Sequence, residues 1–339
     1  MAVELKEYHY LPPGFLESSA KNLHHIIPQP SLIHLKGKKS EPLFIAILQH
    51  GNEAVGLYAV QNLLKSYGSE TLPRSISIFV SNVAAARQNL RRLDHQPDYN
   101  RMWPSKVIEH ELPEAIVMQQ VVERMKQLKP FASIDLHNNT GLNPHYACIN
   151  KLDNRFYHLA SLFSQTVVYF IQPQGVQSIA FAELCPSVTL ECGHTEDESG
   201  ITHAFEFLDS CLQLHEIPDS ADVKNSINIY HTVATVKVPK EFGFSFDDST
   251  EDLYFNPDLE AYNFRQVETG SLFALTHPDK SVFLQVYNEA GNEAQEDYFD
   301  FTNNEIRLKK SLMPSMITLD KNVIRQDCLC YLMEKMDLA

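Results

Sequence analysis

Phe44-Ile-Ala-Ile-Leu-Gln-His50-Gly-Asn-Glu53 is the stretch from which both the fold and the site can be predicted. It opens as a short, bulky, apolar run, which is typical of a strand buried on both faces of a sheet. After His50, apolar residues recur at helical spacing up to Gly68, which predicts a helix with Asn52 as its cap and Glu53 in its first turn. A strand end and the start of the next helix face one crevice in open α/β sheets. The stretch therefore predicts half of a zinc site.

A second apolar run ends in the same way, in Phe131-Ala-Ser-Ile-Asp135-Leu-His137-Asn138-Asn139. Two histidines and one carboxylate leave the fourth zinc position to water, which is the composition of a catalytic site rather than a closed structural one. Asp135 lies two residues before His137, hence on the same face of the strand, and could orient its ring. Asn138 either faces a substrate or ties down the loop, and the sequence leaves both roles open.

A third apolar run, Ser187-Val-Thr-Leu-Glu191-Cys-Gly193, ends in a carboxylate. The neighbours of Glu191 belong in a core, so this side chain is not expected on an ordinary surface. We interpret it as the general base of the site. From this segment alone, a buried carboxylate paired with an arginine is an equally good interpretation.

Length and charge limit the function classes. The 339 residues exceed what one hydrophobic core usually serves, which predicts a larger domain and a smaller one. A net charge of -15 and a pI near 5.4 argue against nucleic-acid or anionic-membrane partners. The amino terminus lacks the apolar core of a signal peptide, and no segment has the length of a membrane span. These features predict a cytoplasmic protein.

The six cysteines are scattered singly, apart from Cys328 and Cys330. None shows the paired spacing of a thiolate zinc site. Cys185 and Cys192 lie near the predicted site in sequence, but a metal and a base are already supplied there. We expect all six to be buried thiols rather than disulfides or ligands.

The order of elements predicts an α/β fold: a mixed, mainly parallel central sheet with helices on both faces, followed by a smaller, mostly β C-terminal domain. Residues 1–222 form the predicted catalytic domain and residues 223–339 the second domain. Expected strands of the first are 31–35, 44–48, 75–80, 131–135, 166–171 and 187–191, with a turn at 37–40 and helices near 54–67, 114–129, 154–164 and 196–215. Strands of the second are expected at 227–230, 232–238, 242–246 and 281–286, and 327–336 is strand or helix.

A polar stretch between Asn82 and Pro104 is rich in arginine. Loops of this length inside a compact domain are usually functional. Of Arg87, Arg91 and Arg92, we expect two to form a solvated face.

Taken together, four segments resemble the zinc carboxypeptidase superfamily, and within it the succinylglutamate desuccinylase and aspartoacylase branch. They are His50-Gly-Asn-Glu53, Asp98-Tyr-Asn100-Arg101, Asp135-Leu-His137-Asn138 and Thr189-Leu-Glu191-Cys-Gly193. The likeness covers roughly residues 42 to 215. Residues 263–274 resemble, more weakly, a sequence motif in the small β-domain of such enzymes. This likeness favours amidohydrolases over true carboxypeptidases.

The resemblance implies that His50, Glu53 and His137 bind one Zn²⁺ per chain and that Glu191 is the general base and acid. Asn100 and Arg101 would hold the carboxylate of a substrate, for which the planar fork of an arginine is suited. Manganese, cobalt or iron would also suit nitrogen and oxygen ligands.

The sequence departs from the family in two places. Where many members have an arginine two residues after the position of Asn82, this chain has Ala84, and Arg87 is the nearest substitute for a residue that stabilises an oxyanion. Residues 172–183 also lack the arginine that relatives often use for the far carboxylate of the acyl chain. Succinyl or aspartyl specificity is therefore not supported.

The leading hypothesis is a zinc amidohydrolase that removes an acyl group from an N-acyl amino acid or a similar small amide. The alternatives are a peptidase that trims a short or cell-wall peptide and, in another class, a non-catalytic protein that binds a metal or ligand. The intact set of three ligands plus Glu191 argues against the last, because capture needs no base. The expected partner is a small molecule or short peptide. The oligomeric state stays open, homo-oligomers included.

Overall fold

The computed structural model describes residues 3–105, 111–195 and 197–338 of the chain. The chain forms two compact units. The first comprises Met1–Asn138 and His145–Asn228, and the second comprises Asn139–Pro144 and Ile229–Ala339. The first unit thus extends slightly beyond the predicted boundary at residue 222, and a short segment of the predicted first domain groups with the second unit.

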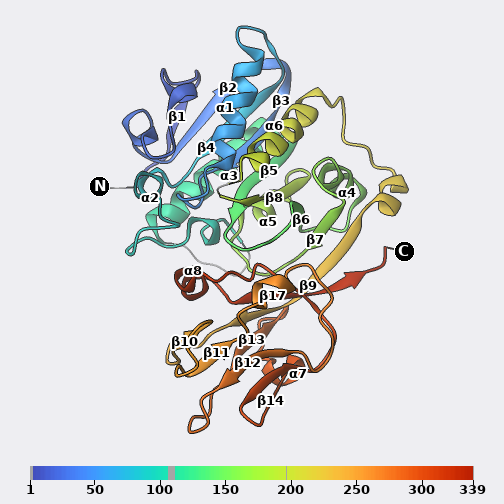
Figure 1. The fold of residues 1–339 in the computed structure, drawn as a ribbon. Helices are drawn as coiled ribbons and strands as arrows, with labels where there is room; N and C mark the ends of the chain where they lie inside the picture. Colours follow the sequence, from blue (N-terminus) through green and yellow to red (C-terminus); the bar gives the residue numbers. More distant parts are fainter. Residues whose placement is uncertain (1–2, 106–110, 196, 339) are drawn as a thin grey trace. The chain divides into compact units, whose positions relative to one another are not determined.

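One mixed sheet runs through the first unit, with strands in the order β1-β2-β4-β3-β5-β8-β6-β7 (Figure 1). The pairs β3/β4, β3/β5 and β6/β7 are parallel, whereas β2/β4 and β6/β8 are antiparallel. The predicted mixed, mainly parallel sheet is confirmed. The strand bounds are β1 Lys6–Tyr8, β2 Ser31–Leu35, β3 Gly37–Ile47, β4 Leu72–Val80, β5 Ala132–Asn139, β6 Tyr146–Ile149, β7 Thr166–Tyr169 and β8 Ser187–His194.

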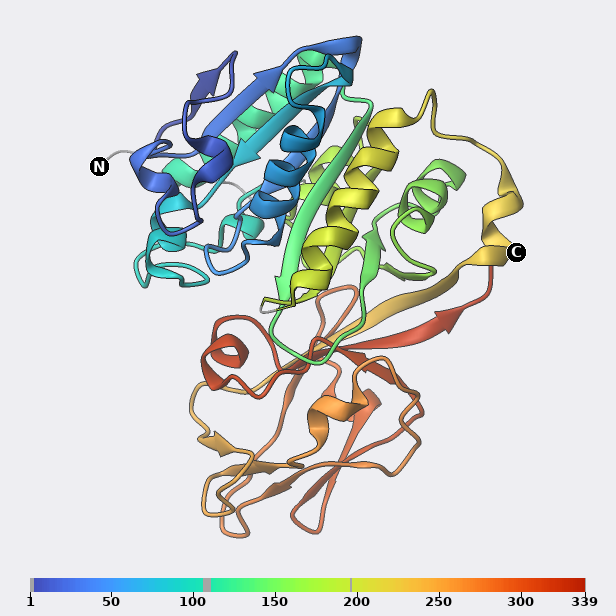
Figure 2. The same ribbon diagram turned by 45° about the horizontal axis from the view of Figure 1, so that its top comes forward.

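Helices cover both faces of this sheet. Their bounds are α1 Val55–Tyr67, α2 Val83–Gln88, α3 Pro113–Leu128, α4 Asn154–Ser161, α5 Gln177–Phe181 and α6 Glu198–Gln213. On one face α3 and α5 form a core with β3, where the rings of Phe181 and Phe44 stack with centroids 4.3 Å apart. On the other face α1 and α6 lie side by side (Figure 2). Among the described helices, none has the length and apolar character needed to cross a membrane.

Glycine at position 56 allows α1 to approach the sheet closely. A Cβ there would lie 2.8 Å from Ile47 Cγ2 on β3 and 2.9 Å from Leu136 Cβ on β5. Since Phe44 faces α5 and Ile47 faces α1, both faces of β3 are covered. This explains the continuous apolar run that predicted a fully buried strand.

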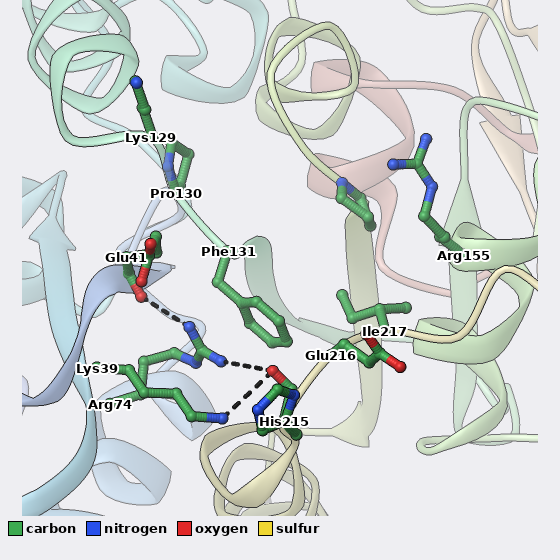
Figure 3. A pocket seen from close by; sticks show the side chains of 11 residues that line it. Lys39, Glu41, Arg74, Lys129, Pro130, Phe131, Arg155, His215, Glu216 and Ile217 are labelled. Carbon is green, nitrogen blue, oxygen red and sulfur yellow. Dashed lines mark hydrogen bonds between the residues drawn. The ribbon is translucent and has the colours of Figure 1, made fainter.

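The carboxyl end of α6 is held by two cations from the sheet. Lys39 Nζ donates to the carbonyls of Leu214 (3.1 Å) and His215 (3.2 Å), and the guanidinium of Arg74 donates to the Leu214 carbonyl at 3.2 Å. The guanidinium carbon of Arg74 also lies 3.5 Å from the ring centroid of Phe131 (Figure 3). No basic residue occupies the last turn of α6 itself. These contacts therefore satisfy its terminal carbonyls and oppose the negative end of its dipole.

The second unit is built mostly on antiparallel strands, as expected from its β-rich sequence, although β10 and β11 pair in parallel. β9 (Asn228–Lys237) pairs with β13 (Gln285–Asn288) and β17 (Cys330–Met336), and β17 pairs with β16 (Met313–Ser315). A five-stranded sheet has the order β10-β11-β12-β15-β14. Its strands are β10 Phe244–Ser245, β11 Leu253–Phe255, β12 Leu272–Thr276, β14 Phe299–Thr302 and β15 Glu305–Leu308; α7 is Gln295–Tyr298 and α8 is Lys321–Gln326.

Several predicted boundaries are wrong. The turn expected at residues 37–40 is part of β3, and the two strands expected between 227 and 238 form the single strand β9. The strand expected at 281–286 begins only at Gln285. The ambiguous end of the chain is strand β17. The predicted helix start at residue 196 lies outside the described residues.

Candidate metal centre

The predicted ligands His50, Glu53 and His137 converge in the first unit. Their donor atoms all lie within 4.8 Å of one another, and all three side chains are buried. His50 Nδ1 lies 2.8 Å from Glu53 Oε1, and His137 Nδ1 lies 2.7 Å from Glu53 Oε2. Both rings therefore turn the same nitrogen toward one carboxylate. Within residues 3–105, 111–195 and 197–338, no other group of three histidine, cysteine, aspartate or glutamate side chains has this spacing.

The backbone brings Glu53 to the site differently from the prediction. The helix α1 begins at Val55, so Glu53 precedes it instead of lying in its first turn. The cap expected at Asn52 is also wrong, because the Val55 N–H donates to Asn138 Oδ1 at 3.1 Å. Asn138 Nδ2 donates in turn to the Gly193 carbonyl at 3.2 Å. The Asn138 amide thus ties β5 to α1 and β8.

A carboxylate lies against the far nitrogen of each histidine. Asp98 Oδ1 is 3.1 Å from His50 Nε2, and Asp135 Oδ2 is 3.0 Å from His137 Nε2. Carboxylates in such positions fix the orientation and tautomer of metal-ligating histidines. Asp135 lies where the sequence placed it for this role, whereas no role was predicted for Asp98.

The arginine beside these side chains is Arg91. Its guanidinium donates to Glu53 Oε1 at 3.4 Å and to Asp98 Oδ2 at 3.2 Å, with only 11% of its side chain exposed. Its carbonyl accepts from the Gly51 N–H at 3.1 Å. Arg87, the substitute suggested by the sequence, is exposed at the end of α2. Arg91, and not Arg87, is therefore the arginine of this stretch that contacts Glu53.

The candidate base Glu191 is buried on β8. Its Oε2 atom accepts no hydrogen bond from any residue that the structure describes. Burial raises the pKa of Glu191 to about 7, and the negative charge of Glu53 adds to this while His137 and His50 oppose it. A carboxyl group with a pKa near neutrality can both take and return a proton at neutral pH.

The protonation states of the three predicted ligands depend on one another. Burial by itself would raise the pKa of Glu53 and lower those of the histidines. Their mutual attraction outweighs burial: the two rings lower the pKa of Glu53, and Glu53 with Asp98 raises the pKa of His50. Asp135 and Glu53 hold the pKa of His137 well above its ordinary value. Without a metal, the neighbouring carboxylates therefore favour the protonated form of both rings.

We expect zinc binding to release protons, up to one from each ring, because a coordinating imidazole must be neutral. The sign follows from the raised pKa values of His50 and His137, since a lower pH favours the protonated rings over the metal. Zinc affinity should fall by up to about 100-fold for each pH unit below neutrality. Calorimetric titration in buffers of different ionisation enthalpy counts the protons. Zinc binding without any proton release would contradict the raised pKa values of the two rings.

The predicted carboxylate-binding pair, Asn100 and Arg101, lies in the short helix Tyr99–Arg101. The Asn100 amide is engaged by the protein: its Nδ2 lies 3.5 Å from Asp135 Oδ2, and its Oδ1 accepts from the Gln177 N–H at 3.1 Å. Arg101 Nη1 donates to the Asn100 carbonyl at 2.9 Å. The Asn100 amide is thus hydrogen-bonded within the protein, and substrate contact by Asn100 or Arg101 stays a prediction.

The donor set fits zinc. Two imidazole nitrogens and one carboxylate oxygen make up a three-ligand site, each ring is anchored at its other nitrogen, and Glu191 presents a buried oxygen that the described residues leave without a hydrogen bond. Catalytic zinc sites use three protein ligands and keep one position for water or substrate.

Comparison with protein-family models gives one match. Residues 43–206 match the succinylglutamate desuccinylase/aspartoacylase catalytic domain. A comparison with curated protein sequences gives no significant match. The matched segment contains His50, Glu53, His137 and Glu191.

Solved structures show the same fold. Succinylglutamate desuccinylase from Vibrio parahaemolyticus has 14% identity and a TM-score of 0.61, over 95% of this chain and 94% of that one. The enzyme of that name from Chromobacterium violaceum has 16% identity and a TM-score of 0.57, over 88% and 86%. Murine aminoacylase 3 has 14% identity and a TM-score of 0.55, over 88% and 96%. Residues 43–206 of this chain therefore match the catalytic domain of the succinylglutamate desuccinylase/aspartoacylase family, and the solved structures of such enzymes share its fold.

Proposed function

We propose that this protein is a zinc-dependent amidohydrolase that removes an acyl group from an N-acyl amino acid or a similar small amide. The family match of residues 43–206 supports hydrolase chemistry of the desuccinylase/aspartoacylase type. The observation that carries the proposal is the convergence of His50, Glu53 and His137 beside Glu191, whose buried Oε2 has no hydrogen-bond partner among the described residues.

In this proposal His50 and His137 hold zinc through Nδ1, together with the carboxylate of Glu53. Zinc in such a site supplies acidity, since it lowers the pKa of coordinated water to about 7 and polarises a carbonyl. Asp98 and Asp135 keep the two rings in the orientation that presents Nδ1.

Glu191 moves the proton. Its Oε2 takes a proton from the attacking water and returns it to the amide nitrogen as the C–N bond breaks. Burial suits this role, because the raised pKa keeps both protonation states accessible near neutrality. Arg91 places a fixed positive charge beside Glu53, where it would stabilise the oxyanion of the tetrahedral intermediate. Arg101 would bind the carboxylate of the amino-acid part.

The test is release of free amine from a panel of N-acetyl, N-succinyl and N-formyl amino acids and short peptides. The zinc-loaded protein should release the amino acid from one acyl class, and chelation should abolish this activity until zinc is restored. Stoichiometric zinc without any release across the panel would contradict the amidohydrolase proposal. Cleavage of peptides alone would favour the peptidase alternative, and failure to bind zinc would contradict the metal site.

A further inference from the structure

A chain of buried polar side chains runs from the aromatic core of the first unit to one predicted metal ligand. Trp103 Nε1 donates to Gln49 Oε1 at 2.6 Å, and Gln49 Nε2 donates to Asp135 Oδ1 at 2.6 Å. The other carboxylate oxygen of Asp135 lies 3.0 Å from His137 Nε2. Trp103 and Asp135 are fully buried, and only 1% of Gln49 and 3% of His137 is exposed.

The donors and acceptors of this chain can be assigned from one end. An indole nitrogen only donates, so the oxygen of the Gln49 amide must face Trp103 and its NH₂ must face Asp135. A carboxylate only accepts, so Asp135 takes one hydrogen bond from Gln49 and another from the Nε2–H of His137. The amide nitrogen of Asn100 also lies 3.2 Å from this Nε2. His137 is then left with Nδ1, the nitrogen that faces Glu53, as the atom available to a metal.

Aromatic packing holds Trp103, the first residue of this series of hydrogen bonds, in one orientation. The Trp103 ring makes edge-to-face contacts with Phe79 and Phe181, at centroid distances of 5.6 and 5.9 Å. These contacts fix the direction of the indole N–H. Rotation of the indole would leave a donor unsatisfied in an apolar core, which costs free energy.

The backbone just before His50 helps to place Gln49 in this series of hydrogen bonds. Leu48 has φ of 56°, in the left-handed region that non-glycine residues rarely adopt. Gln49 and His50 follow it. The Gln49 side chain donates to Asp135, and the His50 ring lies against Glu53. The unusual turn after β3 thus brings two consecutive side chains to different partners at the same site.

We propose that Gln49 and Trp103 are positioning residues of the metal centre, which fix Asp135 and, through it, the orientation and tautomer of His137. Among the described residues, neither side chain donates a hydrogen bond to His50, Glu53, His137 or Glu191, so they act through Asp135. The inference rests on the metal site of the proposed function but not on the identity of the substrate.

The test compares zinc affinity in Gln49→Met and Trp103→Phe, which keep most of the buried volume and remove the hydrogen bonds. Competition with a chromogenic chelator measures the dissociation constant of zinc. Loss of such outer partners typically weakens metal binding by about 10- to 100-fold, which we expect for Gln49→Met, with a smaller loss for Trp103→Phe. The double variant should bind zinc no more weakly than Gln49→Met alone, because both substitutions break one chain.

Gln61 supplies the matched control. It is a buried glutamine on α1, 4% exposed, whose NH₂ donates to the carbonyls of Phe15 (2.7 Å) and Ser18 (2.8 Å). Gln61→Met should lower the melting temperature of the metal-free protein and leave zinc affinity within twofold of the wild type. A purely structural role for Gln49 would give the same pattern as this control.

The outcomes separate the two proposals. Wild-type zinc affinity in a folded Gln49→Met protein would overturn the positioning role, whether or not the enzyme hydrolyses amides. Weakened zinc binding in Gln49→Met supports it even if no substrate in the panel is cleaved. A wild-type protein that binds no zinc would overturn both. If Trp103→Phe fails to fold, Gln49→Met alone still decides.

Discussion

Glu191→Gln is expected to lower kcat/KM by about 10²- to 10⁴-fold while leaving zinc bound, because the amide retains the shape of the carboxyl group but cannot accept and return a proton. Glu191 is not among the three predicted ligands, so metal content should not change. The measurement is the rate of amine release together with zinc content of the same preparation. Glu114→Gln is the matched control, since Glu114 is also 8% exposed but lies on α3. Its activity should remain near that of the wild type.

The same substitution has a second effect with a defined pH dependence. The folded protein raises the pKa of Glu191 from 4.5 to about 7, so ionisation of this group opposes folding above pH 4.5. The penalty grows up to about pH 7 and corresponds to about 3 kcal/mol, at roughly 1.4 kcal/mol per pKa unit. Metal-free Glu191→Gln should therefore unfold at higher denaturant concentration than the metal-free wild type at pH 8 and at the same concentration at pH 4.5. Equal stability at pH 8 would show that Glu191 ionises freely.

The sequence was sufficient to predict the mainly parallel sheet, because the signals lay in short contiguous segments. The apolar runs before His50, before His137 and up to Glu191 each mark a strand, and the carboxyl ends of neighbouring parallel strands such as β3 and β5 meet at one edge of a sheet. Ionisable residues at those ends were therefore expected together, and the structure brings them together.

The partners of these residues could not be predicted in the same way. Arg91 and Asp98 lie in a loop whose path depends on tertiary packing, and no periodicity relates them to Glu53 or His50. Spacing alone favoured Arg87 as the nearest arginine, but Arg87 lies on the exposed end of α2. The one available signal was composition, an arginine-rich stretch in an acidic chain.

Gln49 and Trp103 were missed for another reason. From the sequence alone, Gln49 is explained as a residue at the end of a strand and Trp103 as an aromatic residue of the core. Their hydrogen bond joins positions 54 residues apart. Only the packing of Trp103 against Phe79 and Phe181 places the indole N–H within reach of Gln49. Similarly, the cap of α1 comes from Asn138 on a distant strand rather than from Asn52.

Gly51→Ala is expected to destabilise the protein by about 3 kcal/mol or more, since overpacking against backbone leaves no side chain that can yield. A Cβ on residue 51 would lie 2.2 Å from the backbone nitrogen of Ala86 and 2.3 Å from the carbonyl carbon of Ala85. Glycine is needed here for space rather than for an unusual φ, because Gly51 is not among the residues with positive φ. Urea unfolding of the metal-free protein measures the loss.

Gly68→Ala is the control, because it lies in the same unit and follows α1. Its φ of 55° makes alanine strained, at a cost of about 1–2 kcal/mol, but the nearest atom to a new Cβ is 3.9 Å away. Gly51→Ala should also weaken zinc binding, because Gly51 directly follows His50 and its N–H donates to the Arg91 carbonyl. Gly68→Ala should leave zinc binding unchanged. Equal losses of stability in the two variants would mean that α2 can shift at little cost. The close approach of α2 would then not be what holds His50 in place.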